Sequence, residues 1–210
     1  MVYPIVTYML IAVTTLLYFA SANNPAMKAK LMHYPYEEHR NKEYFRLLTH
    51  GFMHADIMHF GINMFVLWMF GDIIETRFLM TFGILKGRML FLLLYLATIV
   101  AASLPTHFKY KNNPSYRALG ASGATSGLVC IFALFNPWQM LYLYFAIPIP
   151  AIVFAVLYLG YSHWASKNSR DNIGHDAHFW GAIFGVLFTI AFNPAYLSSF
   201  FTNLVQQAPF

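Results

Sequence analysis

The stretch RALGASGATSGLVCIFALF, residues 117–135, joins a run of small residues to an apolar segment long enough to enter a membrane. Within it, Gly123 and Gly127 form a Gly-x-x-x-Gly pair, a spacing that lets two helices in lipid approach closely. Ser122 stands among small residues at the start of the apolar run. A serine at this place is either a packing residue or a nucleophile, and the rest of the chain must decide between the two.

The composition is that of an integral membrane protein. Of the 210 residues, 59% are hydrophobic and 10% are charged, and the mean hydropathy is +0.51. Soluble domains carry about 25% charged residues. Because a membrane span needs roughly 20 apolar residues, the length allows about six spans in a single domain over residues 1–210. The net charge of +5 comes with no nucleic-acid signature, and the basic residues are expected beside lipid headgroups of the bilayer.

The apolar runs predict an all-α membrane protein, a bundle of six transmembrane helices. The first run has some features of a signal peptide, but no Lys or Arg precedes it, which favours a retained span. The polar stretch after it, residues 23–56, has the length of a functional loop. Prolines 148 and 150 suit the first turn of a helix, so residues 136–147 are left as an apolar connector. The spans are expected at residues 4–22, 57–74, 89–104, 119–135, 148–164 and 176–193.

Four polar residues fall in or near the first turns of even-numbered spans: His59, Asn63, Ser122 and His178. Even-numbered spans all run in the same direction, so the four residues should lie near one membrane face at a similar depth. Polar groups inside a membrane are costly and mark functional sites. Any one of them alone could be a packing or hydrogen-bonding residue, but their shared depth predicts one site built from three helices.

Glycine pairs indicate which of these helices touch. Gly123 and Gly127 lie on the fourth span, and Gly181 and Gly185 repeat the same spacing on the sixth. Small residues at this spacing allow close backbone approach. We therefore expect these four glycines to be helix-packing residues that bring the two spans together.

Such packing would bring Ser122 within reach of His178. A serine beside a histidine is the minimal activated nucleophile, because the imidazole accepts the hydroxyl proton. His59 and Asn63 lie four residues apart on one helix face, and both can donate hydrogen bonds to a developing oxyanion. Asp176 is too close in sequence to His178 to face it across a helix, so we interpret it as a helix N-cap and the catalytic unit as a Ser-His dyad.

At this point the sequence resembles the rhomboid intramembrane serine proteases. The motifs that carry the resemblance are MHFGINM at residues 58–64, GASGA at 120–124 and AHFWGAIFG at 177–185. They occur in the family's order on alternate spans. The resemblance implies a bacterial-type core of six helices, with a long, partly membrane-embedded loop between the first and second spans.

The resemblance also implies roles for individual residues. Ser122 matches the family nucleophile and His178 its general base. His59 and Asn63 match the side chains of the oxyanion hole, which the backbone N–H of Ser122 completes. Gly181 matches the glycine at which the sixth span contacts the fourth. No metal and no cofactor is implied.

Two positions depart from the family pattern. A Trp-Arg pair is common in the family's long loop, and this chain has Phe45 and Arg46. Some members carry an aromatic residue four positions after the serine, where it stacks on the catalytic imidazole. This chain has Ser126 there, so its histidine must be held in another way. Residues 148–164 and the loop at 160–175 would form the family's gate and cap.

The function predicted from these residues is that of an intramembrane serine endopeptidase. Its partners would be single-span or multi-span membrane-protein substrates, cleaved at an extended, helix-broken segment. The resemblance implies a bacterial inner membrane and an active site that opens to the non-cytoplasmic side. With that orientation 3 Lys and Arg residues lie inside and 10 outside, which is opposite to the positive-inside rule. The sequence does not predict an oligomeric state.

Two other classes compete with this interpretation. A non-catalytic membrane adaptor, channel or transporter could use the polar centre, although transporters usually show internal repeats and sites at mid-depth. A metalloprotease is suggested by the nine histidines. However, the chain has no H-E-x-x-H motif.

Overall fold

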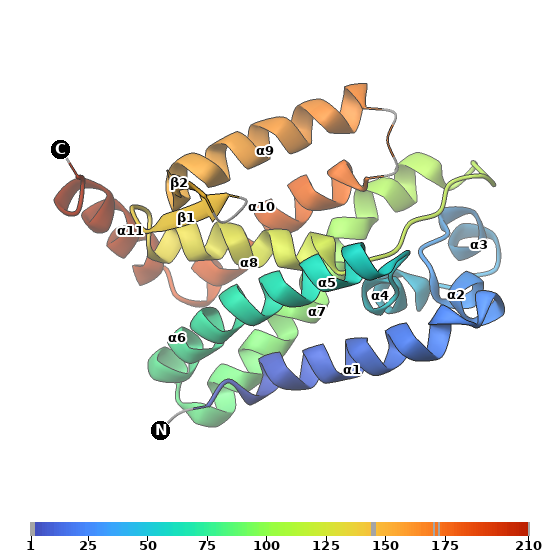
Figure 1. Ribbon diagram of the computed structural model, residues 1–210, viewed down its shortest axis with the longest axis horizontal. Helices are drawn as coiled ribbons and strands as arrows, with labels where there is room; N and C mark the ends of the chain where they lie inside the picture. The colour runs from blue at the N-terminus through green and yellow to red at the C-terminus, as the bar shows by residue number, and fades with distance from the viewer. Residues whose placement is uncertain (1–2, 144–145, 170, 172, 210) are drawn as a thin grey trace.

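The computed structural model describes residues 3–143, 146–169, 171 and 173–209. Helices make up most of the chain, and a small hairpin and several loops join them (Figure 1). The long helices are α1 (Ile5–Ala22), α5 (Ile57–Val66), α6 (Asp72–Phe82), α7 (Ile84–Tyr110), α8 (Ser122–Phe135), α9 (Ala151–Asn168), α10 (His175–Phe192) and α11 (Ala195–Gln206).

Three helical segments of the described chain are long and apolar enough to cross a membrane: Ile5–Ala22, Ile57–Phe82 and Ile84–Tyr110. The second of them joins α5 to α6 through one turn of π-helix, η2 (Leu67–Gly71). The bent pair α10 and α11 would make a fourth. Helix α8 is shorter, with 14 residues. The predicted helical membrane protein is therefore confirmed, while six spans remain a prediction.

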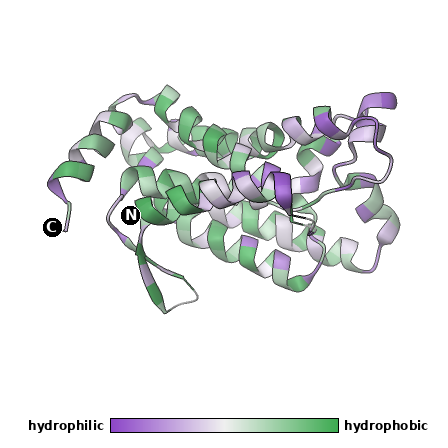
Figure 2. Cartoon of the chain, turned by 90° about the horizontal axis from the view of Figure 1, so that it is seen from above, coloured by the Kyte–Doolittle hydropathy of each residue, from purple (hydrophilic) through white to green (hydrophobic). Residues whose placement is uncertain are grey.

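Helix α8 lies at the centre of the bundle, and α5, α6, α7, α9, α10 and α11 all contact it (Figure 1). Most of its residues are buried. Helices α5, α8 and α10 run in the same direction and begin toward the end of the molecule that carries the loop helices. Figure 2 shows hydrophilic residues gathered at that end. The three helices that carry the polar residues predicted to share one depth thus begin at the same end of the bundle.

The long polar stretch folds into short helices rather than an irregular loop. They are α2 (Pro25–Leu31), α3 (Pro35–Arg40), α4 (Arg46–Thr49) and the 3₁₀ turn η1 (His50–Phe52). Asn24 begins α2 as an N-cap, because its side chain accepts a hydrogen bond of 2.9 Å from the Met27 N–H. Caps of this kind satisfy N–H groups that the helix leaves open.

A buried carboxylate ties these short helices to α7. Glu38 is fully buried, and its two oxygens lie 2.6 Å from Nδ1 of His33 and 2.7 Å from Nδ1 of His107. The Tyr34 N–H donates a third hydrogen bond of 2.9 Å. Burial raises the pKa of Glu38, but these hydrogen bonds and the neighbouring His33 outweigh it and hold the pKa below its ordinary value. The carboxylate is therefore ionised and pins α3 against α7.

A second buried carboxylate holds the start of α1. Glu75 of α6 accepts hydrogen bonds from the N–H of Val6 at 3.0 Å and from the N–H and hydroxyl of Thr7 at 2.7 and 2.8 Å. The first N–H groups of a helix have no partner within the helix, and the helix dipole favours negative charge there. Glu75 thus fixes α1 against α6.

The structure moves several predicted span boundaries: the helical segment of the second span continues to Phe82 instead of ending at residue 74, and α7 begins at Ile84 instead of residue 89. Helix α7 also continues through Pro105 to Tyr110, although the third span was expected to end at residue 104. Buried side chains beyond the proline, including Thr106 and His107, keep this last part packed. Proline has no N–H, so it removes one backbone hydrogen bond from the helix. That loss is not enough to end a helix whose following residues are buried.

The connector before the fifth span is a β-hairpin, not an extension of a helix. β1 (Met140–Leu143) pairs antiparallel with β2 (Ile147–Pro150), and Met140 faces Pro150. The expected start of a helix at Pro148 is therefore wrong, and α9 begins at Ala151. A proline has no N–H for the ladder and is tolerated on a strand whose outer edge is unpaired, which a two-stranded hairpin provides.

The chain also turns sharply after α10. The Asn193–Pro194 break bends α11 by 109° from α10. The Tyr196 hydroxyl on α11 donates a hydrogen bond of 2.8 Å to Thr81 of α6. The sequence analysis did not predict this last helix.

Candidate active site

Ser122 is the first residue of α8, and the long loop holds the segment that leads to it. His33 and Ala118 exchange two backbone hydrogen bonds of 2.9 and 3.0 Å. The Gly120 N–H donates to the His50 carbonyl at 2.9 Å. Gly120 has φ +123°, a conformation that residues with a side chain rarely adopt. The loop helices therefore set the position of the turn that presents Ser122.

Helices α8 and α10 are in backbone contact through their glycines. A Cβ added to Gly181 would lie 2.1 Å from the Gly123 carbonyl oxygen. A Cβ on Gly127 would lie 3.0 Å from the Gly181 oxygen, and one on Gly185 would lie 3.0 Å from the Gly127 Cα. No side chain fits between the two helices at these levels, so the glycines set the distance between α8 and α10.

This contact brings the neighbours of Ser122 and His178 together. A Cβ on Gly123 would lie 3.3 Å from the carbonyl oxygen of Ala177. Ser122 and His178 are thus on facing first turns, and both are half-buried. No hydrogen bond joins their side chains among the described residues; catalytic hydrogen bonds are often long or poorly aligned before substrate binds.

His59 and Asn63 of α5 approach the same turn. The His59 ring lies where a side chain of residue 120 would be, because a Cβ on Gly120 would lie 2.7 Å from its Nε2. The Asn63 oxygen accepts a hydrogen bond of 3.0 Å from the Thr125 hydroxyl of α8, and the Asn63 Nδ2 donates to the His59 carbonyl at 2.8 Å. An amide NH₂ has two hydrogens, so Asn63 can still make a second donation.

The geometry therefore gathers all four predicted residues around the start of α8. Ser122 is on α8 itself, His178 comes from α10, and His59 and Asn63 come from α5. Such an arrangement can support nucleophilic attack by a hydroxyl with a nearby base and hydrogen-bond donors for an oxyanion.

Comparison with known proteins identifies the family of this chain. A model of the rhomboid domain matches residues 41–195. The chain belongs to the rhomboid family. It is 33% identical to RHOMBOID-like protein 12, mitochondrial, of Arabidopsis thaliana over 65% of this chain and 43% of that protein. All of the four residues lie within the rhomboid match.

Two bacterial rhomboid proteases are also similar. GluP of Bacillus subtilis is 28% identical over 86% of this chain and 34% of its own length. GlpG of Haemophilus influenzae is 28% identical over 75% of this chain and 74% of its own length. The chain thus spans less than half of the Arabidopsis and Bacillus relatives and about three quarters of the Haemophilus one.

One residue of this rhomboid site was not found from the sequence. Tyr158 of α9 stacks beside His178, with ring centroids 6.1 Å apart and planes inclined by 23°. The Tyr158 hydroxyl lies 2.5 Å from Oγ of Ser126, and Ser126 donates to the Ser122 carbonyl at 2.6 Å. The fifth span carries no motif that singles out this tyrosine, since its position depends on how α9 packs.

His54 of the long loop also contacts the turn before Ser122. It is fully buried, and its Nε2 accepts a hydrogen bond of 3.4 Å from the Ala121 N–H. Its ring meets that of His59 edge to face at 5.1 Å. Burial lowers the pKa of His54 to about 4, so the ring is neutral and able to accept. His54 therefore supports the turn before Ser122.

Asp176 does not cap α10, contrary to the N-cap interpretation. The N-cap is Gly174, and Asp176 lies inside the first turn. Its carboxylate accepts a hydrogen bond of 3.0 Å from Lys109 of α7. The negative charge near the helix N-terminus is favourable. Asp176 is not the cap because α10 begins one residue before it, at His175.

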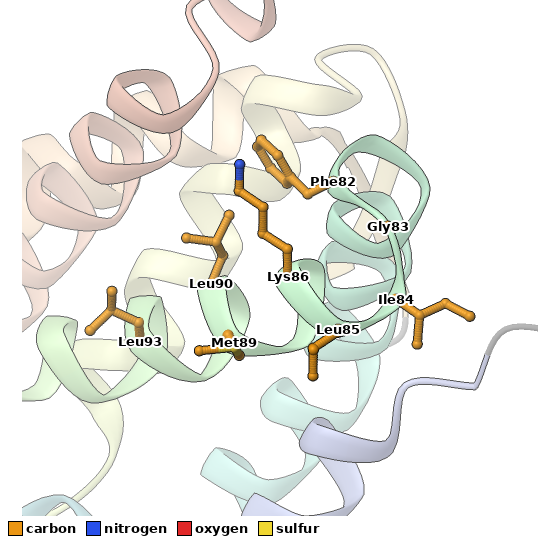
Figure 3. Close-up of a pocket in the computed structure, with 8 residues that line it drawn as sticks. All are labelled: Phe82, Gly83, Ile84, Leu85, Lys86, Met89, Leu90 and Leu93. Carbon is orange, nitrogen blue, oxygen red and sulfur yellow. The ribbon is translucent and has the colours of Figure 1, made fainter.

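Two cavities among the described residues lie away from this turn. The larger, of about 670 Å³, is an apolar groove at the turn between α6 and α7, between residues 82 and 93 (Figure 3). A smaller one of about 140 Å³ is lined by residues of α6, α8 and α11. None of the four predicted residues lines either cavity. The described residues contain no group of three His, Cys, Asp or Glu side chains placed to hold a metal ion.

Proposed function

We propose that this rhomboid protein is an intramembrane serine endopeptidase that cleaves membrane-protein substrates with a dyad of Ser122 and His178. The observation that carries the proposal is the backbone contact of α8 and α10 at Gly123 and Gly181, one residue after Ser122 and three after His178. A contact this close supports a serine and a histidine working on one substrate bond. The two similar bacterial proteins named rhomboid proteases support the reaction class.

In the proposed reaction Ser122 Oγ attacks the carbonyl carbon of the scissile peptide bond. His178 accepts the hydroxyl proton and returns it to the leaving nitrogen, so the amine departs and an acyl-enzyme remains. A water molecule then attacks the ester carbonyl. His178 takes one proton of that water and returns it to Ser122 Oγ as the carboxylic acid leaves.

The tetrahedral intermediates would be stabilised by three donors. The Ser122 N–H belongs to the first turn of α8, where N–H groups lack helical partners. His59 and Asn63 would supply the other two. The packing of His59 against Gly120 and the hydrogen bond between Asn63 and Thr125 support their orientation toward this turn. Each donor is expected to lower the barrier by about 3 kcal/mol.

The proposed substrates are single-span or multi-span membrane proteins cut in or near a transmembrane segment. A helical backbone hides its carbonyl groups in hydrogen bonds, so the scissile segment must be extended when it meets Ser122. Small or helix-breaking residues at the cleavage site are expected for this reason.

We further propose a single domain over residues 1–210 that crosses the membrane six times, counting α8 and α9 as spans. The wrapping of α8 by other helices supports this, because a helix that meets little lipid can be short. We propose a bacterial inner membrane, with the start of α8 facing the non-cytoplasmic side. The bacterial relatives support this location.

Single cysteines would test this orientation. Cys130 is buried and does not compete with exposed sites. A membrane-impermeant maleimide added to intact bacterial cells should label Ser115→Cys, next to the loop helices, and leave Lys86→Cys unlabelled. The opposite pattern would overturn the orientation without affecting the proposed chemistry.

The reaction itself is tested with a serine-reactive fluorophosphonate and with a single-span reporter substrate in detergent. The wild-type chain should be labelled and should cut the reporter, and Ser122→Ala should do neither. Ser199→Ala, on α11, is the matched control and should behave as wild type. Equal labelling of wild type and Ser122→Ala would refute the assignment of the nucleophile. A folded wild type that neither labels nor cleaves would indicate a non-catalytic membrane protein.

A further inference from the structure

We propose that Tyr158 of α9 is the positioning residue for His178, and that it supplies from a neighbouring helix the aromatic ring that position 126 lacks. The proposal rests on the proposed peptidase function. It adds a residue that no sequence motif assigns.

The ring contact is the first observation. The Tyr158 and His178 rings lie nearly parallel, with centroids 6.1 Å apart. His178 is half-buried, and an imidazole with space around it can rotate about its side-chain bonds. A ring packed along one face restricts that rotation, and the negative face of an aromatic ring also favours a cation. Tyr158 can therefore hold the imidazole before it accepts a proton and support it afterwards.

The second observation is the hydrogen bond between the hydroxyls of Tyr158 and Ser126. Which of the two donates follows from the number of hydrogens available. Ser126 has one hydroxyl hydrogen, which it donates to the Ser122 carbonyl at 2.6 Å. The 2.5 Å contact between Ser126 Oγ and the Tyr158 oxygen must then be donated by Tyr158. A directed chain runs from Tyr158 through Ser126 to the backbone of Ser122. One side chain of α9 thus lies beside His178 and is linked through Ser126 to the backbone of Ser122.

Position 126 explains why α9 can do this. Ser126 is buried between α8 and α9, and its small side chain leaves room for the tyrosine. A large ring at position 126 would take the same space. Residues on the other side of α9, such as Leu157 and Trp164, are exposed. The helix therefore packs through one face, and the order of His178 depends on that packing.

The test compares rates of fluorophosphonate labelling of Ser122 in the full chain in detergent. Tyr158→Leu removes ring and hydroxyl, and we expect labelling at least about tenfold slower, a part of the ~10²- to 10⁴-fold that a general base contributes. Tyr158→Phe keeps the ring and should lose about threefold or less. Trp164→Leu, an aromatic residue on the exposed side of the same helix, is the matched control and should stay within about twofold of wild type.

A rescue variant separates positioning from a structural role. The double variant Ser126→Tyr with Tyr158→Leu returns an aromatic ring to α8 and should regain most of the labelling rate. On the reporter substrate, Tyr158→Leu should lower kcat and leave KM nearly unchanged. Tyr158→Phe removes only the hydroxyl oxygen and is the variant that remains if the larger changes fail to fold; a loss of more than about tenfold in it would overturn the view that the ring positions His178.

The outcomes are distinguishable. Wild-type labelling together with unchanged labelling of Tyr158→Leu would overturn the role of Tyr158 and leave the dyad intact. A slower Tyr158→Leu whose loss tracks a fall in thermal stability, with no rescue by the double variant, would also overturn it. A wild type that is not labelled at all would instead refute the proposed function.

Discussion

The Gly181→Ala substitution is the sharpest test of how the site is assembled. The new Cβ would lie 2.1 Å from the Gly123 carbonyl oxygen, 2.6 Å from its carbon and 2.9 Å from its Cα. Comfortable contact begins near about 3.5 Å, so the two backbones must separate by more than about 1 Å. Backbone atoms cannot rotate away as a flexible side chain can, so the helix backbone around Gly123 of α8 or Gly181 of α10 has to move.

The size of the expected effect follows from that displacement. Ser122 is adjacent to Gly123, and His178 is three residues before Gly181, so the shift passes directly to the proposed dyad. A misplacement of about 1 Å can cost about 10²-fold in rate. The strain of overpacking is expected to cost about 1–3 kcal/mol of stability. We therefore expect a folded protein that is labelled and cleaves about 100-fold more slowly than wild type.

The assay measures fluorophosphonate labelling and reporter cleavage in detergent, with thermal unfolding as the check on folding. Two glycines provide graded controls. A Cβ on Gly160 of α9 would meet nothing within 4 Å, so Gly160→Ala should keep full activity. A Cβ on Gly185 would lie 3.0 Å from Gly127, so Gly185→Ala should lose activity to an intermediate extent. Wild-type labelling of Gly181→Ala would refute the view that this contact sets the geometry of the dyad.

Three further predictions concern the surroundings of the site. Glu38→Gln should lower the thermal unfolding temperature at pH 7, since it weakens a buried charged network by about 2 kcal/mol. Because the pKa of Glu38 is lowered in the folded protein, its contribution is present above the unfolded pKa of about 4.3 and is lost as the pH falls through the folded pKa. The unfolding temperature of wild type should therefore fall more steeply than that of Glu38→Gln below about pH 5, and parallel curves would contradict this. Asp176→Ala removes a partly exposed pair with Lys109 worth at most about 1 kcal/mol, so cleavage should stay within a few-fold of wild type, and complete loss would indicate a catalytic triad. Thr125→Val removes the hydrogen bond to Asn63 and should slow cleavage several-fold. It should also lower the unfolding temperature, because it leaves the buried Asn63 oxygen without this partner at a cost of about 1–3 kcal/mol. Unchanged cleavage would show that this bond does not position Asn63 for the oxyanion.

The parts of the site that could be predicted are those with a signature along one helix. The Gly-x-x-x-Gly pairs and the shared direction of alternate helices led from Ser122 to His178 without any tertiary information. The spacing of His59 and Asn63 gave a common face in the same way. Each of these inferences needs only helix periodicity and the direction of the chain through the membrane.

The parts that could not be predicted depend on contacts between distant segments. Tyr158 is one aromatic residue among many in the fifth span, and only the packing of α9 on α8 puts it beside His178. The buried pair of Glu38 and His107 joins a loop helix to α7, and it also keeps α7 helical beyond Pro105. Aspartate is suited to capping a helix, but α10 begins one residue before Asp176, and the Asp176 carboxylate instead pairs with Lys109 of α7.

Two serines one turn apart on α8 differ in their hydrogen bonds and in their exposure. Ser126 lies inside the helix, donates its hydrogen to the carbonyl four residues before it and accepts one from Tyr158. Its one hydroxyl hydrogen is therefore already committed to a hydrogen bond within the helix. Ser122 is the first residue of the helix and has no helical carbonyl four residues before it to accept its proton. Its side chain is half-exposed and makes no hydrogen bond among the described residues. A hydroxyl that the fold leaves unused, on a turn held by the loop, by the glycine contact and by α9, is one that remains free to react.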